Sequence, residues 1–104
     1  MATMREITFK VVQIDEIILD YKEMLLNVLK TPKNRQSAMA EEMETVLPIR
    51  AALRSAEGKC LLSEEAWKEL NERVQDTQWT AILPEFKQYM DDIKNAPKVE
   101  VAPA

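Results

Sequence analysis

The chain has 104 residues, of which 46% are hydrophobic and 31% charged, the composition of one small soluble domain. A chain of this length buries about two-thirds of its unfolded surface on folding, so we expect one core and no second domain. It contains no histidine, one glycine and one cysteine. This excludes Ser-His-Asp and Cys-His catalytic sets, most zinc sites, glycine-rich nucleotide loops and an intrachain disulfide.

The net charge of −4 has the wrong sign for a protein whose main task is to neutralise phosphates, so nucleic acid is an unlikely partner. A small secreted domain usually carries disulfides, so the single Cys60 favours a reducing compartment. No segment approaches the roughly 20 apolar residues of a membrane span, and residues 1–10 lack the pattern of a signal peptide. We therefore expect a soluble cytoplasmic protein that does not bind a membrane.

The first element is a short strand over residues 6–12. Ile7, Phe9 and Val11 alternate with polar residues, and this period of two is typical of a half-buried strand. The sequence leaves open whether this N-terminal segment is a strand or an extension of the helix that follows.

The second element is a helix over residues 15–30, because apolar residues from Ile14 to Leu29 recur at spacings of three and four. Its start is at Gln13 or Asp15, and Pro32 ends it. The helix carries more apolar residues than one face requires. We therefore expect it to be central to the core or shared with another chain.

A second helix is predicted from an N-cap at Ser37 to a terminating Gly58, which can adopt a positive φ. Pro48 interrupts its apolar pattern, since a proline inside a helix removes an amide donor and clashes with the carbonyl four residues earlier. The sequence does not decide whether Pro48 kinks this helix or opens a separate short one. Residues 59–62 are predicted to be a brief strand that pairs with the first.

Two further helices follow. Ser63 is the predicted N-cap of the third, which ends near Asp76 or Thr77, and Pro84 is the first residue of the fourth, which ends near Asn95. The predicted fold is a mainly α bundle of about four helices. The sequence leaves open whether residues 6–12 and 59–62 add a minor two-stranded ribbon. The domain covers residues 1–95, and residues 96–104 are expected to be a flexible tail.

We predict no catalytic role for the paired carboxylates or for the cysteine. Glu41-Glu42 and Glu64-Glu65 lie at predicted helix starts, where acidic side chains stabilise unpaired amides. Asp91 and Asp92 lie near the end of the fourth helix, which leaves contact with a basic partner as an alternative to simple solvation. Cys60 beside Leu61 and Leu62 is expected to be buried and inert. We expect no enzyme activity, no cofactor and no metal site.

A protein-binding surface is the leading hypothesis. Met24, Met39 and Met43 lie on or beside the apolar stripes, where flexible thioethers fill the core or adapt to a partner. Trp79 falls at a helix junction, and tryptophan is enriched among interface anchors. We expect a noncatalytic interaction module that acts through an apolar helix face, and self-association is one form of this hypothesis.

The alternative is a DNA-binding regulator that uses the basic loop of residues 30–35, with Lys30, Lys33 and Arg35 on phosphates. A third hypothesis is an enzyme that holds a divalent metal with Asp and Glu. The sequence shows no recognition helix for the DNA-binding hypothesis and no converging set of ligands for the metal hypothesis.

The stretch from Met39 to Pro97 resembles small uncharacterised proteins of bacteriophage and prophage gene clusters. The resemblance rests on a helix ending in Leu53-x-x-Ala56-Glu57-Gly58, on Trp67-x-x-Leu70, on Trp79, and on Phe86 followed by Asp91 or Asp92 and Asn95-Ala96-Pro97. Pro48 departs from this pattern. The resemblance implies a phage-encoded protein of a bacterial cell with a noncatalytic role in virion assembly or host interaction, and it identifies no functional residue.

Overall fold

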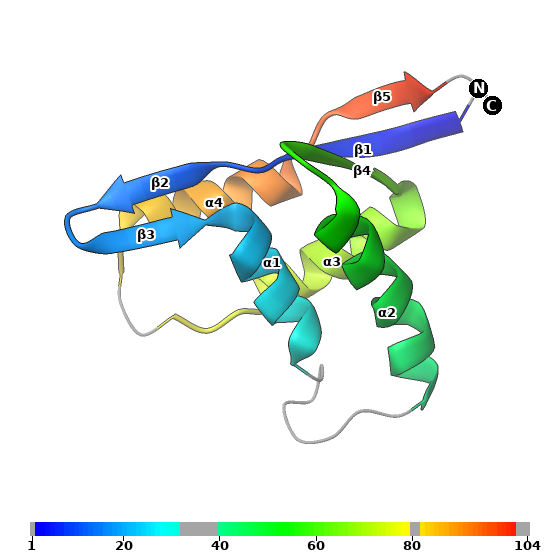
Figure 1. Cartoon of the computed structure of the whole chain (residues 1–104), viewed down its shortest axis with the longest axis horizontal. Helices are drawn as coiled ribbons and strands as arrows, with labels where there is room; N and C mark the ends of the chain where they lie inside the picture. The colour runs from blue at the N-terminus through cyan, green and yellow to red at the C-terminus, as the bar shows by residue number, and fades with distance from the viewer. Residues whose placement is uncertain (1, 32–39, 80–81, 102–104) are drawn as a thin grey trace.

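The computed structural model describes residues 2–31, 40–79 and 82–101 and places four helices and five strands along them. In chain order these are β1 (Ala2–Thr8), β2 (Val11–Ile14), β3 (Ile17–Asp20), α1 (Tyr21–Lys30), α2 (Ala40–Ser55), β4 (Lys59–Ser63), α3 (Glu64–Gln75), α4 (Pro84–Lys94) and β5 (Lys98–Val101). The tip of the β2–β3 hairpin and the paired ends of β1 and β5 lie at opposite ends of the molecule (Figure 1).

β1 is the central strand of a three-stranded antiparallel sheet in the order β4-β1-β5. Ile7 lies opposite Cys60 and Arg5 lies opposite Leu62, while Met4 pairs with Val99 on the β5 side. Because alternate residues share a face, Ile7, Cys60 and Leu62 all point to the same side, and all three are buried. This face of the sheet packs against α2 and α3.

Arg5 lies on that same face and ties β1 to α3 and to the segment after α4. Its Nε and Nη2 donate to the Glu64 carboxylate at 2.8 and 2.9 Å. Its Nη1 donates to the carbonyl of Ala96 at 2.8 Å, and its guanidinium lies 3.9 Å from the ring centroid of Trp67. The sheet is therefore joined by one side chain to the start of α3 and to the segment after α4.

β2 and β3 form a separate two-stranded antiparallel hairpin in which Val12 lies opposite Leu19. Its turn contains Asp15 at φ 53°, a left-handed conformation that aspartate adopts more readily than most residues. Leu19 is buried and Val12 packs against the core, whereas Val11 and Ile18, on the opposite face, are exposed. The hairpin thus has one face on the core and one face open.

The helix ends follow local capping rules. The carboxylate of Asp20 caps α1 by accepting from the amide of Lys22 at 3.0 Å. Ser63 Oγ caps α3 by accepting from the amide of Ala66 at 3.1 Å, which confirms the predicted cap. α4 begins at Pro84, also as predicted.

One hydrophobic cluster joins the helices to β1 and β4. Its buried members are Ile7, Tyr21, Leu25, Leu29, Val46, Ile49, Leu53, Cys60, Leu62, Leu70, Val74, Tyr89, Ile93 and Ala96. Cys60 is buried as predicted, and burial raises the pKa of its thiol. The single cluster fits the small size of the chain.

The predicted fold class is wrong. The chain is an α+β fold with two antiparallel sheets and not a mainly α bundle. The expected contact between residues 59–62 and the first strand does form, with Ile7 opposite Cys60, but within a three-stranded sheet. The third strand, β5, comes from residues 98–101, within the segment that the sequence predicts to be a flexible tail. It pairs with β1 from Ala2↔Val101 to Arg5↔Lys98.

The predicted helix over residues 15–30 is also wrong in its first six positions, which form the hairpin turn and β3. Ile17 and Ile18 match the helical spacing, but they are β-branched and favour a strand. The helix begins after Asp20, which supplies the cap. The apparent excess of apolar surface on this helix therefore belongs partly to the hairpin.

α2 runs without a break from Ala40 to Ser55, so Pro48 does not open a separate helix. The side chain of Pro48 is exposed. Gly58 has a positive φ of 74° as expected, and it lies in the turn between α2 and β4. The predicted cap at Ser37 lies outside the described residues.

Candidate functional site

A groove with a volume of about 950 Å³ lies between α1, the C-terminal part of α3 and the segment after α3. We call it the α1–α3 groove. Its described lining residues are Met24, Asn27, Val28, Thr31, Asn71, Glu72, Arg73, Gln75, Asp76, Thr77, Gln78, Trp79 and Tyr89. The α1 residues recur at spacings of three and four, so one side of that helix forms one wall.

An aromatic cluster forms the apolar end of the groove. The Trp79 ring stacks on Phe86 with centroids 4.4 Å apart and meets Tyr89 edge-on at 6.1 Å. Tyr89 in turn meets Tyr21 edge-on at 5.0 Å. The Trp79 indole donates from Nε1 to the sulfur of Met90 at 3.2 Å. Trp79 is thus held by its neighbours while it remains partly exposed to the groove.

Side-chain amides line the polar edge. Gln75 Nε2 donates to the Met90 carbonyl at 2.9 Å and to Asn71 Oδ1 at 3.2 Å. Asn27 and Gln78 are exposed on opposite sides of the groove. These amides offer both donors and acceptors beside the carboxylates of Glu72 and Asp76.

The arginine in this lining, Arg73, forms its contacts within the fold. Arg73 is 7% exposed and donates to Glu42 at 2.7 Å, to Glu69 at 3.1 Å and to the carbonyl of Thr31 at 3.2 Å. These contacts join α3 to α2 and to the end of α1. Arg73 therefore holds the groove walls together and does not present a free cation to a ligand.

The Tyr89 hydroxyl is an unusual feature of the floor. Tyr89 is fully buried, and its hydroxyl has no hydrogen-bond partner among the described residues. Burial, followed by the nearby Tyr21, raises the pKa of Tyr89 well above its usual value, so the group stays neutral. An unpaired buried hydroxyl costs free energy, and a ligand polar atom that reached it would recover that cost.

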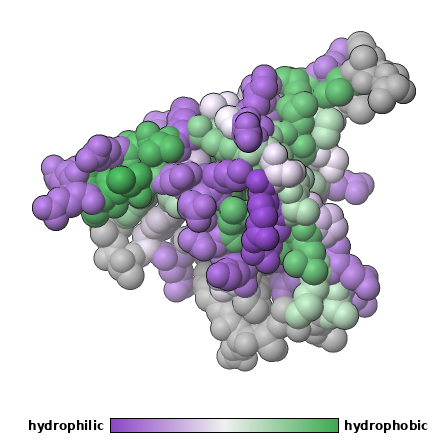
Figure 2. Space-filling view, viewed as in Figure 1, coloured by the Kyte–Doolittle hydropathy of each residue, from purple (hydrophilic) through white to green (hydrophobic). Residues whose placement is uncertain are grey.

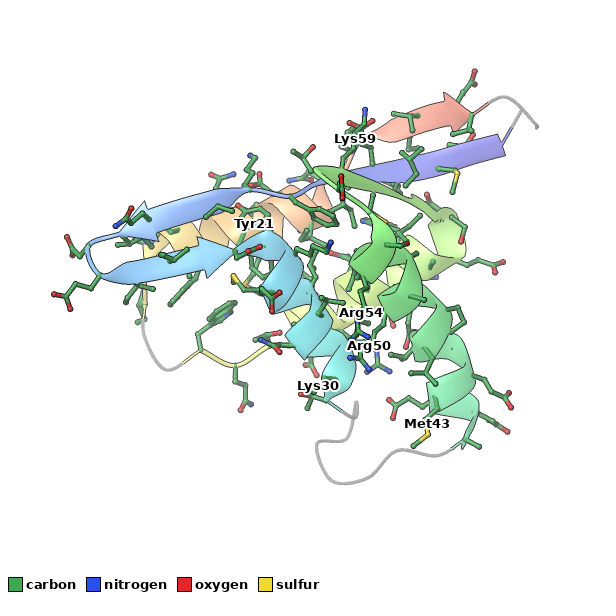
Figure 3. The ribbon with its side chains drawn as sticks, viewed as in Figure 1. Tyr21, Lys30, Met43, Arg50, Arg54 and Lys59 are labelled. Atoms are coloured by element: carbon green, nitrogen blue, oxygen red, sulfur yellow. The ribbon has the colours of Figure 1, made fainter. Side chains whose placement is uncertain are left out.

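Two of the predicted partner contacts, Met24 and Trp79, line the same groove. Met43 lies on α2, is 49% exposed and is not part of the groove lining (Figure 3). Met39 lies outside the described residues. The amides of Asn71 and Gln75 were not singled out from the sequence, although their spacing of four on one helix places them on one face.

Asp91 and Asp92, also predicted as partner contacts, take part in contacts within the chain. Asp91 pairs with Lys87 one turn earlier. Asp92 accepts hydrogen bonds from Tyr21 at 2.6 Å, Gln88 at 2.8 Å and Lys10 at 3.2 Å.

Partial burial raises the pKa of Asp92, but the hydrogen bonds from Tyr21, Gln88 and Lys10 together outweigh it, and the pKa lies below its usual value. Asp92 therefore ties α4 to the base of the hairpin and to the start of α1.

The basic loop of the DNA-binding alternative lies mostly outside the described residues. Lys30 is exposed at the end of α1, and positions 33 and 35 are not described. Across the described segments, no group of three or more Cys, Asp or Glu side chains is placed to hold a metal ion. In the same segments, no helix has the length and apolarity needed to cross a membrane.

Comparisons with protein-family models, curated proteins and solved structures find no match to this chain. Its function is therefore inferred from its own geometry, and the resemblance to phage proteins stays a prediction.

Proposed function

We propose that the chain is a noncatalytic protein-interaction module that holds an apolar side chain of a partner peptide in the α1–α3 groove. The observation that carries this proposal is the position of Trp79, which is fixed by Phe86 and Met90 and lines an open groove with Met24. A rigid aromatic side chain beside a flexible thioether is well suited to receive an apolar anchor.

The amide edge supports a peptide as the ligand. A peptide main chain presents alternating amide donors and carbonyl acceptors, and Asn27, Gln75 and Gln78 offer both kinds of group without a charge to desolvate. The apolar end of the groove would take one side chain of that peptide, while the amide edge would bind the adjoining main chain.

A noncatalytic role is favoured by the chemistry of the lining. The described lining residues include no histidine, cysteine or serine, and Arg73 is engaged by two carboxylates and a carbonyl. We further propose, from the phage resemblance alone, that the partner is a protein of virion assembly or of the host cell.

Selection of a displayed library of random short peptides on the immobilised full chain tests this function. We expect enriched peptides to share an aromatic or large aliphatic residue, and we expect binding to be lost in Trp79→Ala. Enriched peptides that bind the wild type and Trp79→Ala equally would contradict the proposal, and so would the absence of any enrichment.

Because Trp79 also supports the fold, a second variant keeps the test clear. Asn27→Arg places a bulky side chain into the groove from an exposed position on α1, and we expect it to abolish binding without unfolding the chain. Gln13→Arg adds the same charge on the exposed surface of the hairpin and is the matched control. It is expected to bind selected peptides as the wild type does.

A further inference from the structure

Exposed apolar side chains concentrate on two surfaces outside the groove. Seven large hydrophobic residues are exposed in the described segments, and five of them fall on the hairpin or on α2. These are Val11 (66%), Ile17 (51%) and Ile18 (64%) on the hairpin and Met43 (49%) and Leu47 (53%) on α2. Figure 2 shows the hydrophobic area of the hairpin on the same side of the molecule as an apolar area over α2.

On α2, the exposed apolar pair continues into a pair of arginines. Positions 43, 47, 50 and 54 are spaced by three and four residues, so they form one stripe along the helix. We call these residues, Met43, Leu47, Arg50 and Arg54, the α2 stripe. Arg50 and Arg54 lie along the side of α2 that borders α1, as Figure 3 shows. The stripe is thus apolar toward the start of α2 and cationic toward its end.

The cations of this stripe have no acidic partner in the described part of the chain. No carboxylate there forms an ion pair with Arg50 or Arg54, and the Nε of Arg50 is buried without a hydrogen-bond partner. Lys22 lies beside them and donates to the carbonyls of Arg54 at 3.0 Å and Ala56 at 2.7 Å. A row of uncompensated positive charge in an acidic protein is a binding surface for carboxylates.

The hairpin has a pattern of charged and apolar residues that complements the α2 stripe. Its turn consists of Asp15 and Glu16, which are exposed and make no ion pair with any described cation. Behind this acidic tip, Ile18 and Val11 are exposed on the outer face, whereas Ile17 is exposed on the face that carries Leu19. The hairpin is therefore anionic at its tip and apolar behind it.

We propose that the hairpin of one copy of this chain docks on the α2 stripe of a second copy. In this contact the acidic tip meets Arg50 and Arg54, and Ile18 packs toward Leu47. Along the α2 stripe, Leu47 and Arg54 are separated by about 10 Å of helix rise, and on the hairpin Ile18 is the second residue after the Asp15–Glu16 turn.

This contact joins two different surfaces, so it is heterologous. Unless two copies dock reciprocally as a closed pair, each copy retains a free hairpin and a free α2 stripe, and addition of further copies produces a ring or an open filament. The proposal is independent of the peptide-binding function, because neither surface includes a residue that lines the α1–α3 groove.

Sedimentation velocity across a concentration series tests the contact through a charge exchange. We expect the mean mass of the wild type to rise with concentration and to fall again at high salt, since salt screens the charged part of the contact. Arg50→Glu with Arg54→Glu reverses the stripe, and Asp15→Asn with Glu16→Lys reverses the tip while keeping a residue that tolerates positive φ at position 15. Each double variant alone is expected to stay a monomer.

An equimolar mixture of the two double variants restores opposite charges at every junction, so we expect it to associate. Lys68→Glu with Lys94→Glu makes the same change in net charge as the stripe variant, on exposed lysines elsewhere. Because its tip and stripe are intact, this control is expected to associate as the wild type does. Circular dichroism confirms that each variant is folded. A wild type that is monomeric at every concentration overturns the proposal, as do folded double variants that associate normally or a mixture that stays monomeric.

Discussion

The two sheets of this protein differ in how much of their apolar surface they bury. The three-stranded sheet buries Ile7, Cys60 and Leu62 against the helices. The hairpin buries Leu19 but leaves Val11 and Ile18 more than 60% exposed on its outer face. Burial of an apolar side chain supplies folding free energy, whereas an exposed one is available to a partner. The three-stranded sheet therefore supports the fold, whereas the proposed docking uses the hairpin as a contact element.

The way each sheet is anchored agrees with this division. Arg5 joins the three-stranded sheet to α3 and to the segment after α4 through hydrogen bonds to Glu64 and Ala96. The hairpin is held at its base, where the amide of Tyr21 donates to the carbonyl of Lys10 at 3.0 Å and the Tyr21 hydroxyl donates to Asp92. Its tip extends away from these anchors (Figure 1).

The largest expected effect breaks the sheet. Ile7→Ala removes a fully buried side chain from the central strand, and we expect it to lower the free energy of unfolding by about 3 kcal/mol. Ile18→Ala makes the same kind of change on the open face of the hairpin and is expected to cost about 0.5 kcal/mol or less. Urea denaturation measures both. If both variants lose the same free energy of unfolding, the two apolar side chains contribute equally to stability and the distinction between the sheets is wrong.

A smaller effect is expected at the base of the hairpin, where the hydroxyl groups of two tyrosines differ in their hydrogen bonding. Tyr21→Phe removes the 2.6 Å hydrogen bond to Asp92, and we expect a loss of about 1–2 kcal/mol because the acceptor is charged. Tyr89→Phe removes a hydroxyl with no described partner, so it is expected to leave stability unchanged or to raise it. Thermal unfolding of the two variants gives the comparison, and a larger loss in Tyr89→Phe would contradict it.

The smallest expected effect is the pH dependence of this anchor. The pKa of Asp92 in the folded chain lies below its ordinary value of 3.8. Such a carboxylate stabilises the fold above its unfolded pKa, and this contribution disappears as the pH falls through the folded pKa. We therefore expect Asp92→Asn to flatten the loss of stability below about pH 4, as measured by urea denaturation at several pH values. Asp91→Asn, whose carboxylate pairs with an exposed lysine, is the control.

Parts of the fold could be predicted because their signals are local. Ser63 and Pro84 mark the starts of α3 and α4, and capping depends on residues within one turn. The hairpin was missed because its turn has no glycine and because Ile14, Ile17 and Ile18 satisfy a helical spacing as well as a strand. β5 was missed because its four residues follow Pro97, and its pairing with β1 joins opposite ends of the chain.

The candidate site could be predicted only in part. Trp79 was singled out because it lies at a helix junction, and Met24 because it borders an apolar stripe. The groove itself arises because α1 lies beside α3, and the sequence holds no local signal for that contact. The same contact brings the amides of Asn71 and Gln75 into one groove lining with Asn27, so they could not be recognised as a set from the sequence.

Self-association through the hairpin and α2 perturbs these two surfaces and leaves the three-stranded sheet unchanged. A residue-resolved NMR concentration series on the ¹⁵N-labelled wild type distinguishes the surfaces. We expect amide shifts to move with concentration in two separate places, around Asp15 to Ile18 and around Leu47 to Arg54, with β1 unchanged. Shifts confined to the hairpin, shifts centred on β1, or no shift at any concentration would contradict the claim.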